Sequence, residues 1–138
     1  MYLLDTNVIS DGTKPIPNLG LQTWLKNTPP SLLFLSVISL GEIRKGIQRQ
    51  KITRRGLELQ TWFDKDLRPN FEGRILPVSE KIMNCWGEIC ADAISAGQTP
   101  PLMDSLLAAT AIEHGLILVT RNTDDVAMLP VSVLNPWA

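Results

Sequence analysis

The sequence is poor in the residues on which zinc sites, disulfide frameworks and histidine-based active sites depend. Its 138 residues include one histidine, His114, and two cysteines, Cys85 and Cys90. The cysteines are five positions apart in a segment of helical periodicity, which points them to different faces and favours neither a disulfide nor a zinc site. His114 stands at an expected helix end, where capping or surface exposure is the usual role. Metal binding or catalysis must therefore rest on other residue types.

The chain also lacks a strong net charge and a long apolar run. Its formal net charge is −1, so bulk charge predicts neither nucleic-acid nor membrane binding. No apolar run is long enough to cross a bilayer, and the first residues do not resemble a signal peptide. We therefore expect a cytoplasmic protein with no membrane partner. A chain of this length with 44% hydrophobic residues suits a single domain over residues 1–138.

Short apolar runs alternate with segments of helical periodicity. Buried strands are predicted at five places: Tyr2–Leu4, Leu32–Leu35, Ile75–Val78, Ile117–Val119 and Val131–Leu134. Strands separated by helices predict a central parallel sheet with helices on both faces, a three-layer α/β/α fold. No glycine-rich loop follows the first strand, which excludes a dinucleotide-binding site of the usual kind.

Single residues predict several helix boundaries. Ser39 begins a helix that Gly56 interrupts, and a second helix follows and ends before Pro69, so that the two form a hairpin. Asp104 begins a later helix, which closes at Gly115 as a C-terminal cap.

Five acidic residues follow strands or stand at helix starts. They are Asp5 after the first strand, Glu42 in the first turn of the helix after the second, Asp104 at a helix start, and Asp124 and Asp125 after a later strand. The carboxyl ends of parallel strands share one edge of the sheet, so these side chains are expected to converge. Two carboxylates about 4 Å apart repel by roughly 4 kcal/mol at an effective dielectric near 20. Convergence therefore requires a cation, and an oxygen-only set of donors selects Mg²⁺ or Mn²⁺.

Each acid also has a purely structural interpretation. Ser39 and Glu42 match a capping box, Asp104 suits a helix N-cap, and Asp5 and the Asp124–Asp125 pair suit turns. It is the shared position of all of them at one edge that favours a metal site.

Basic residues cluster in one stretch that contains no acid. Six fall within twelve positions: Arg44, Lys45, Arg49, Lys51, Arg54 and Arg55. This pattern fits either a solvated helix face and loop or a strip that contacts phosphates.

Four motifs, in this order and at this spacing, resemble the PIN-domain nucleases and, among them, the VapC-type toxins of bacterial toxin–antitoxin pairs. The motifs are Tyr2–Ser10, Ser36–Ile43 with Gly46 and Ile47, Asp104–Ala111, and Leu118–Thr123. The closing Val133–Trp137 resembles the FitB subgroup. The resemblance covers essentially the whole chain and implies a PIN-like fold and cleavage of RNA by a Mg²⁺- or Mn²⁺-dependent endoribonuclease. It also implies a homodimer and an antitoxin partner, a small DNA-binding protein.

The resemblance also implies roles for individual residues. Asp5, Glu42 and Asp104 would be catalytic residues and metal ligands, with Asn7 and Thr120 as polar supports. Related sequences place a fourth acid at or shortly after the position of Asn122. Since that residue is an amide here, Asp125 is expected to be the fourth catalytic ligand, with Asp124 as second choice. Arg44, Lys45 and Arg49 would hold the RNA backbone.

Other functions remain open at this point. A phosphohydrolase would use Asp5 as its nucleophile, but such domains usually carry a second nearby acid where this chain has Asn7. A catalytically silent module that binds nucleic acid or an antitoxin, or a non-toxin RNA-processing nuclease of the same family, would also fit the motifs.

Overall fold

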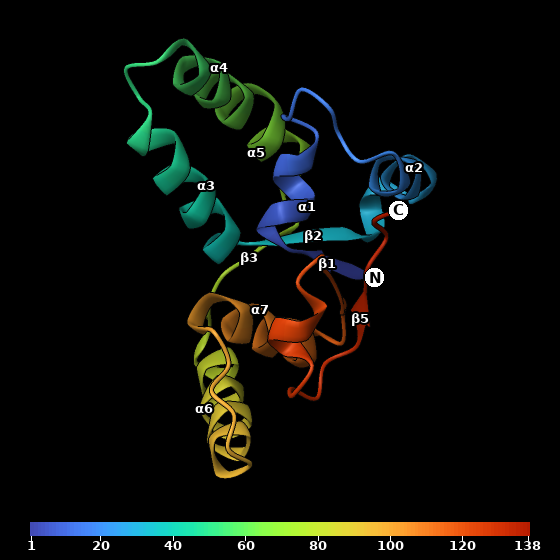
Figure 1. Ribbon diagram of the computed structural model, residues 1–138, viewed down its shortest axis with the longest axis vertical. Coiled ribbons are helices and arrows are strands. Elements are labelled where there is room, and N and C mark those ends of the chain that lie inside the picture. Colours follow the sequence, from blue (N-terminus) through green and yellow to red (C-terminus); the bar gives the residue numbers. More distant parts are fainter.

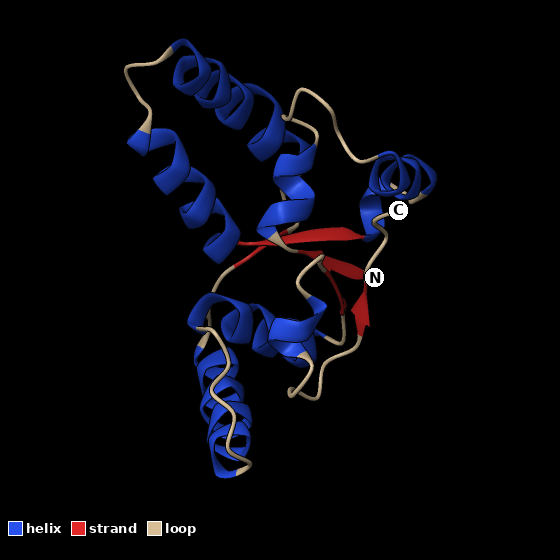
Figure 2. Cartoon of the chain, viewed as in Figure 1, coloured by secondary structure: helices blue, strands red, loops and turns tan.

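The sheet is parallel throughout, and the first strand lies at its centre. The computed structural model describes residues 1–138. Its strands are β1 (Tyr2–Leu4), β2 (Leu33–Ser36), β3 (Ile75–Leu76), β4 (Ile117–Val119) and β5 (Val133–Leu134), in the order β3-β2-β1-β4-β5. β1 pairs in parallel with β2 on one side and with β4 on the other (Figure 2). Later strands are thus added on both sides of β1. The carboxyl end of β1 is therefore the topological switch point, the place where ligands bind in such sheets.

Helices cover both faces of the sheet and confirm the predicted three-layer class (Figure 1). One face carries α1 (Thr6–Asp11), α2 (Leu19–Asn27), the 3₁₀ turn η1 (Pro30–Leu32), α3 (Val37–Arg49), α4 (Arg54–Trp62), the π-helical η2 (Phe63–Leu67) and α5 (Arg68–Asn70). The other carries α6 (Glu80–Ser95) and α7 (Leu102–His114), and the 3₁₀ turn η3 (Thr123–Val126) follows β4. None of the helices combines the length and apolarity that a membrane span needs.

Successive side chains of the central strands pack into two different apolar cores, one on each face of the sheet. In β1, Leu3 packs into the core with α6 and α7, and Leu4 packs into the core with α1 to α4 and η2. In β4, Leu118 and Val119 divide in the same way. Because both faces of the sheet are covered, each strand is an unbroken apolar run, the pattern that made the strands visible in the sequence.

The hairpin of α3 and α4 exists, but its predicted boundaries were wrong. α3 begins at Val37, two residues before the predicted start at Ser39, because Ser36 is its N-cap and accepts a hydrogen bond from the Ile38 amide. The break lies at residues 50–53, and Gly56 is inside the first turn of α4. Pro69 does not follow the second helix but continues it: the π-helical turn η2 places Pro69 in the first turn of α5, where its missing N–H is tolerated.

Gly56 lets the hairpin turn close tightly. Thr53 caps α4 by accepting a hydrogen bond from the Gly56 amide at 3.0 Å. A Cβ atom at position 56 would lie 1.9 Å from the carbonyl oxygen of Gln50, on the turn between the helices. Backbone cannot yield as a flexible side chain can, so this position accepts only glycine.

Gly56→Ala is therefore expected to destabilise the protein, although alanine favours helices over glycine by about 0.5–1 kcal/mol. The matched control is Gly87→Ala in α6, where a Cβ would meet nothing within 4 Å and alanine should stabilise. Urea unfolding of both variants measures the two free energies. A stabilised Gly56→Ala would contradict the close approach of the turn.

Candidate metal centre

Asp5 is fixed by hydrogen bonds at the carboxyl end of β1. It is the N-cap of α1 and is 5% exposed. Its Oδ1 accepts from the Thr6 amide at 2.7 Å, and its Oδ2 accepts from the Thr120 hydroxyl at 2.6 Å. Thr120, which follows β4, accepts in turn from the Asn122 amide at 3.0 Å. These contacts tie the ends of the two central strands together and hold the Asp5 carboxylate in one orientation.

Thr6 joins Asp5 to Glu42. Its hydroxyl donates to Glu42 Oε1 at 2.7 Å, while its amide donates to Asp5. Glu42 lies in the second turn of α3 rather than the first, and the capping-box interpretation with Ser39 is wrong because Ser36 caps this helix. This role of Thr6 was not predicted from the sequence, where its only signal is a hydroxyl residue directly after a strand-ending aspartate.

Asp104 and Asp125 approach the same centre from the other side of the sheet. Asp104 is the third residue of α7 and not its N-cap, which is Pro101. Burial and then the charges of Asp5, Asp125 and Glu42 raise the pKa of Asp104 to about 6. Asp125 in η3 therefore lies within range of both aspartates, and Asp124 is not among the charges that act on them.

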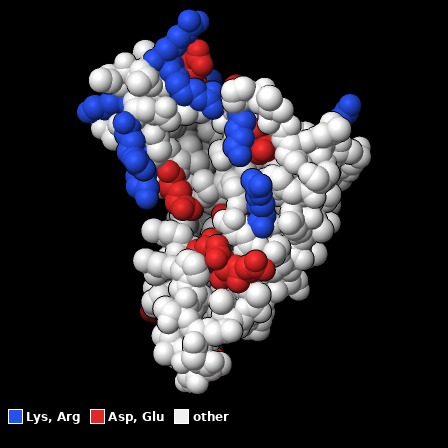
Figure 3. Space-filling model, in the orientation of Figure 1, with Lys and Arg blue, Asp and Glu red and all other residues white.

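No positive group balances these four carboxylates. The protein contains two ion pairs, Lys14–Asp11 and Arg54–Glu58, and neither involves Asp5, Glu42, Asp104 or Asp125. Burial raises the pKa of Asp5 against the hydrogen bonds from Thr120 and Thr6, and Glu42 and Asp125 raise it further. Figure 3 shows acidic side chains gathered in the hollowed middle of one face, with Lys and Arg side chains around its upper part. The centre has the electrostatics of a cation site.

The donors suit a hard divalent cation in kind. All four are carboxylates, the ligands that Mg²⁺ and Mn²⁺ prefer over zinc. In the present side-chain arrangement, no three His, Cys, Asp or Glu residues are close enough together to hold an ion. Unbalanced like charges favour such separation in the absence of an ion.

Two buried polar side-chain atoms, close in the sequence to Asp5 and Glu42, have no protein partner. They are Oδ1 of Asn7, two residues after Asp5, and Oγ of Ser39, three residues before Glu42. Buried polar groups are nearly always hydrogen-bonded, so both atoms require water or a ligand. Asn7, expected as a polar support, thus makes no hydrogen bond to protein, whereas Thr120 does.

The remaining predicted site residues differ in how close they lie to the carboxylates. Asn122 and Asp124 are exposed, and only the backbone amide of Asn122 contacts the centre, through Thr120. On α3, Arg49 and Lys45 follow Glu42 by seven and three residues, which places them about 20° and 60° from it around the helix. Arg44 is about 160° away and donates to Gln60 of α4. The structure therefore brings Arg49 and Lys45 to the side of the carboxylates and leaves Arg44 on the opposite side.

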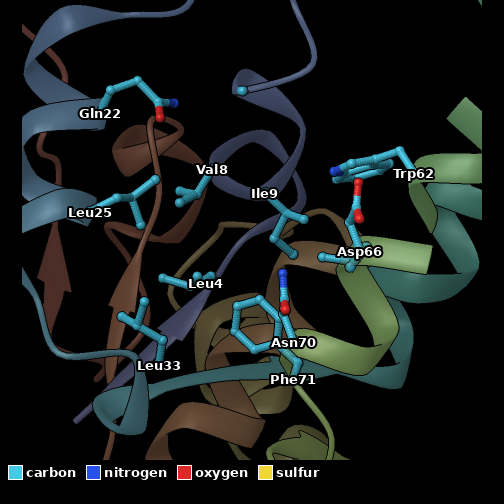
Figure 4. Close-up of a pocket in the computed structure, with 12 residues that line it drawn as sticks. Leu4, Val8, Ile9, Gln22, Leu25, Leu33, Trp62, Asp66, Asn70 and Phe71 are labelled. Atoms are coloured by element: carbon cyan, nitrogen blue, oxygen red, sulfur yellow. The ribbon is translucent and has the colours of Figure 1, made fainter. Parts of the chain in front are cut away.

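An apolar cavity of about 390 Å³ lies apart from the carboxylates. It is enclosed by α1, α2, β1, β2 and the α4–α5 segment, and most of its lining is hydrophobic, including Leu4, Val8, Leu25 and Phe71 (Figure 4). None of the four carboxylates lines it, so this cavity is separate from the candidate metal centre.

Both the sequence and the fold have relatives among known proteins. The PIN domain family matches residues 2–128. Toxin FitB of Neisseria gonorrhoeae is 34% identical over 137 residues, 99% of each chain. VapC ribonuclease Y4jK of Sinorhizobium fredii is 30% identical over 99% of this chain and 98% of the relative. In the structure of FitAB bound to an IR36 DNA fragment, a chain of 33% identity superposes with a TM-score of 0.94, covering 100% of this chain and 96% of that one.

Asp104→Asn is expected to stabilise the protein above pH 6 when a chelator removes divalent ions. The pKa of Asp104 is about 6 in the folded protein against an ordinary value of 3.8, so the folded state binds the proton more tightly. The contribution of this carboxyl to stability is thus present at low pH and is lost as the pH rises from about 4 through 6.

The measurement is thermal unfolding in EDTA at pH 8 and pH 4. The variant should gain a few degrees in Tm at pH 8 and little at pH 4. Glu88→Gln, an exposed carboxylate on α6, is the control. A variant that is less stable than the parent at pH 8 would show that Asp104 is balanced by a protein group.

Proposed function

This chain belongs to the PIN domain family, as its motifs indicated, and we propose that it is an endoribonuclease that uses Mg²⁺ or Mn²⁺ and serves as the toxin of a toxin–antitoxin pair. The observation that carries the proposal is the convergence of Asp5, Glu42, Asp104 and Asp125 at the switch point of the sheet with no positive group among them. A relative named as a VapC ribonuclease supports RNA as the substrate.

Asp5 and Asp104 are proposed as the principal ligands, and Glu42 and Asp125 complete the set. These residues would hold a divalent ion, which when bound would lower the pKa of a water molecule and stabilise the charge that builds up on phosphorus. The hydrogen bonds from Thr6 and Thr120 hold Asp5 in position for such a ligand. Glu42 uses Oε1 to accept from Thr6 and keeps Oε2 free, so it can take a proton from the attacking water. His114 is exposed at the far end of α7 and takes no part.

Arg49 and Lys45 are proposed to hold the RNA backbone. Both are exposed on α3 beside the Glu42 face, where their charges can contact phosphates on either side of the cleaved bond. Arg44, also expected in this role from the sequence, is engaged by Gln60 on the other side of the helix. We therefore propose a smaller part for Arg44.

The partner is proposed to be a small DNA-binding antitoxin. One relative is named Toxin FitB, and a similar chain occurs in a FitAB complex bound to DNA. The homodimer implied by the family resemblance is part of the same proposal. Co-expression with a small DNA-binding protein from the neighbouring gene should relieve growth arrest and yield a stable complex.

Asp5→Asn and Asp104→Asn are expected to abolish Mg²⁺-dependent cleavage of RNA without unfolding the protein. Each removes a charge from the ion, so the loss in kcat/KM should exceed the 10–100-fold that an outer hydrogen-bond partner contributes. Gel assays of a labelled RNA with Mg²⁺, Mn²⁺ or EDTA measure it, and Glu88→Gln is the control. Full activity of either variant in saturating metal, or undiminished cleavage in EDTA, would refute the assignment.

Thr6→Val is expected to weaken the use of metal while leaving all four carboxylates in place. It removes the hydroxyl that donates to Glu42 but keeps the amide that donates to Asp5. The Mg²⁺ concentration for half-maximal cleavage should rise by about 10–100-fold. Thr6→Ser keeps the hydroxyl, so its half-maximal Mg²⁺ concentration should be close to that of the parent protein. If Thr6→Val and Thr6→Ser behaved alike, the hydroxyl would have no positioning role.

A further inference from the structure

A second cavity, of about 210 Å³, opens directly beside Glu42. Two facing rows of residues line it. Thr6 and Ser10 are four residues apart on α1, and Glu42, Gly46 and Gln50 repeat at the same interval on α3. Since Thr6 and Glu42 also belong to the carboxylate centre, this cavity and the centre share a wall.

The α4 side of the hairpin closes the cavity. Thr13 lines it beyond the end of α1, and Arg55 of α4 donates to the Thr13 carbonyl oxygen. Trp62, the last residue of α4, lines this cavity as well as the larger apolar one, and its indole N–H donates to no protein group. The cavity is thus enclosed on three sides and has one aromatic surface.

The polar atoms of the lining keep unused hydrogen-bonding capacity. Ser10 already donates its hydroxyl proton to the Thr6 carbonyl oxygen at 2.9 Å, and Thr13 donates to the Ser10 carbonyl oxygen at 2.7 Å. The side-chain amide of Gln50 donates to the Gly46 carbonyl oxygen at 3.5 Å, which leaves its own oxygen free. The second N–H of that amide and the indole N–H of Trp62 are also unused, so the lining offers both acceptors and donors to a bound group.

The size of the cavity limits that group to a single ring system. Pockets for drug-sized ligands are about 300–1,000 Å³, and this one is smaller. An adjoining cavity is lined by Gly46, Arg49 and Gln50, so a cation lies next to the ring site at the distance of one helical turn. A ring with hydrogen-bonding groups, linked to an anion and placed beside the proposed phosphodiester centre, describes a nucleotide.

We infer that the cavity between α1, α3 and α4 is a nucleobase subsite, which takes an unstacked base next to the cleaved phosphodiester while Arg49 contacts the adjoining phosphate. Proteins read single-stranded RNA in this way, by stacking bases on aromatic rings and bonding their edges. The lining offers both acceptors and donors, so it can bond the polar edge of a base. The inference rests on the proposed RNA substrate and adds a base-binding subsite to it.

Gly46 allows the subsite to be filled from within. It lines both cavities, and a Cβ at this position would meet nothing within 4 Å. Gly46→Leu should therefore fold normally and occupy the space meant for a base. Gly87→Leu on α6 is the matched control, since its Cβ is equally free and lies on the helix remote from the centre.

The test is fluorescence anisotropy with a labelled RNA of six adenosines, bound to the cleavage-deficient Asp5→Asn protein. Removing the base from one nucleotide at a time should weaken binding by about tenfold at one position and less elsewhere. Adding Gly46→Leu should lower affinity for the intact RNA to the abasic level and abolish the positional effect, whereas adding Gly87→Leu should preserve it.

A flat abasic profile, or a positional effect that persists in the Gly46→Leu protein, would overturn the subsite. Circular-dichroism melting of each variant checks that it is folded. Cleavage of the same RNA by the unsubstituted protein tests the nuclease proposal separately. Cleavage together with a flat abasic profile would support the nuclease proposal and refute the subsite. A positional effect without cleavage would support the subsite and refute the nuclease proposal.

Discussion

Repulsion among four carboxylates is the constraint around which this protein is built. A parallel sheet brings the ends of β1, β2 and β4 to one edge, and Asp5, Glu42, Asp104 and Asp125 converge there without a basic partner. The fold tolerates this because Thr6 and Thr120 hold Asp5 and because the pKa values of Asp5 and Asp104 rise. A divalent cation would remove the repulsion, which links the stability of the centre to its proposed chemistry.

The helical hairpin extends this centre into a surface for a polymer. α3 carries Glu42 at the sheet edge and Arg49 two turns further along the same side, and the tight turn at Gly56 sets α4 against it. One helix thus combines a carboxylate for the centre, a wall of the polar cavity and a cation at its outer end. A substrate longer than one nucleotide would suit this arrangement better than a small phosphate ester.

The sequence was most informative where burial decides the structure. Strands covered on both faces are continuous apolar runs, so the sheet and its acidic edge could be predicted. Helix starts were predicted wrongly where two nearby residues could both serve as the N-cap. Ser36, rather than Ser39, caps α3. Gly56 and Pro69 looked like helix breaks because propensity says nothing of a close backbone approach or a π-helical turn. The bond from Thr6 to Glu42 and the Gln60 contact of Arg44 join distant segments, and no sequence pattern revealed them.

Anomalous diffraction from crystals grown with Mn²⁺ would test the central claim most directly. A single strong peak, or a close pair, is expected between the carboxylates of Asp5 and Asp104, with Glu42 or Asp125 turned toward it. The peak should disappear in Asp104→Asn crystals grown under the same conditions. A structure at saturating Mn²⁺ that shows no peak at this edge of the sheet, or a basic side chain in its place, would contradict the account.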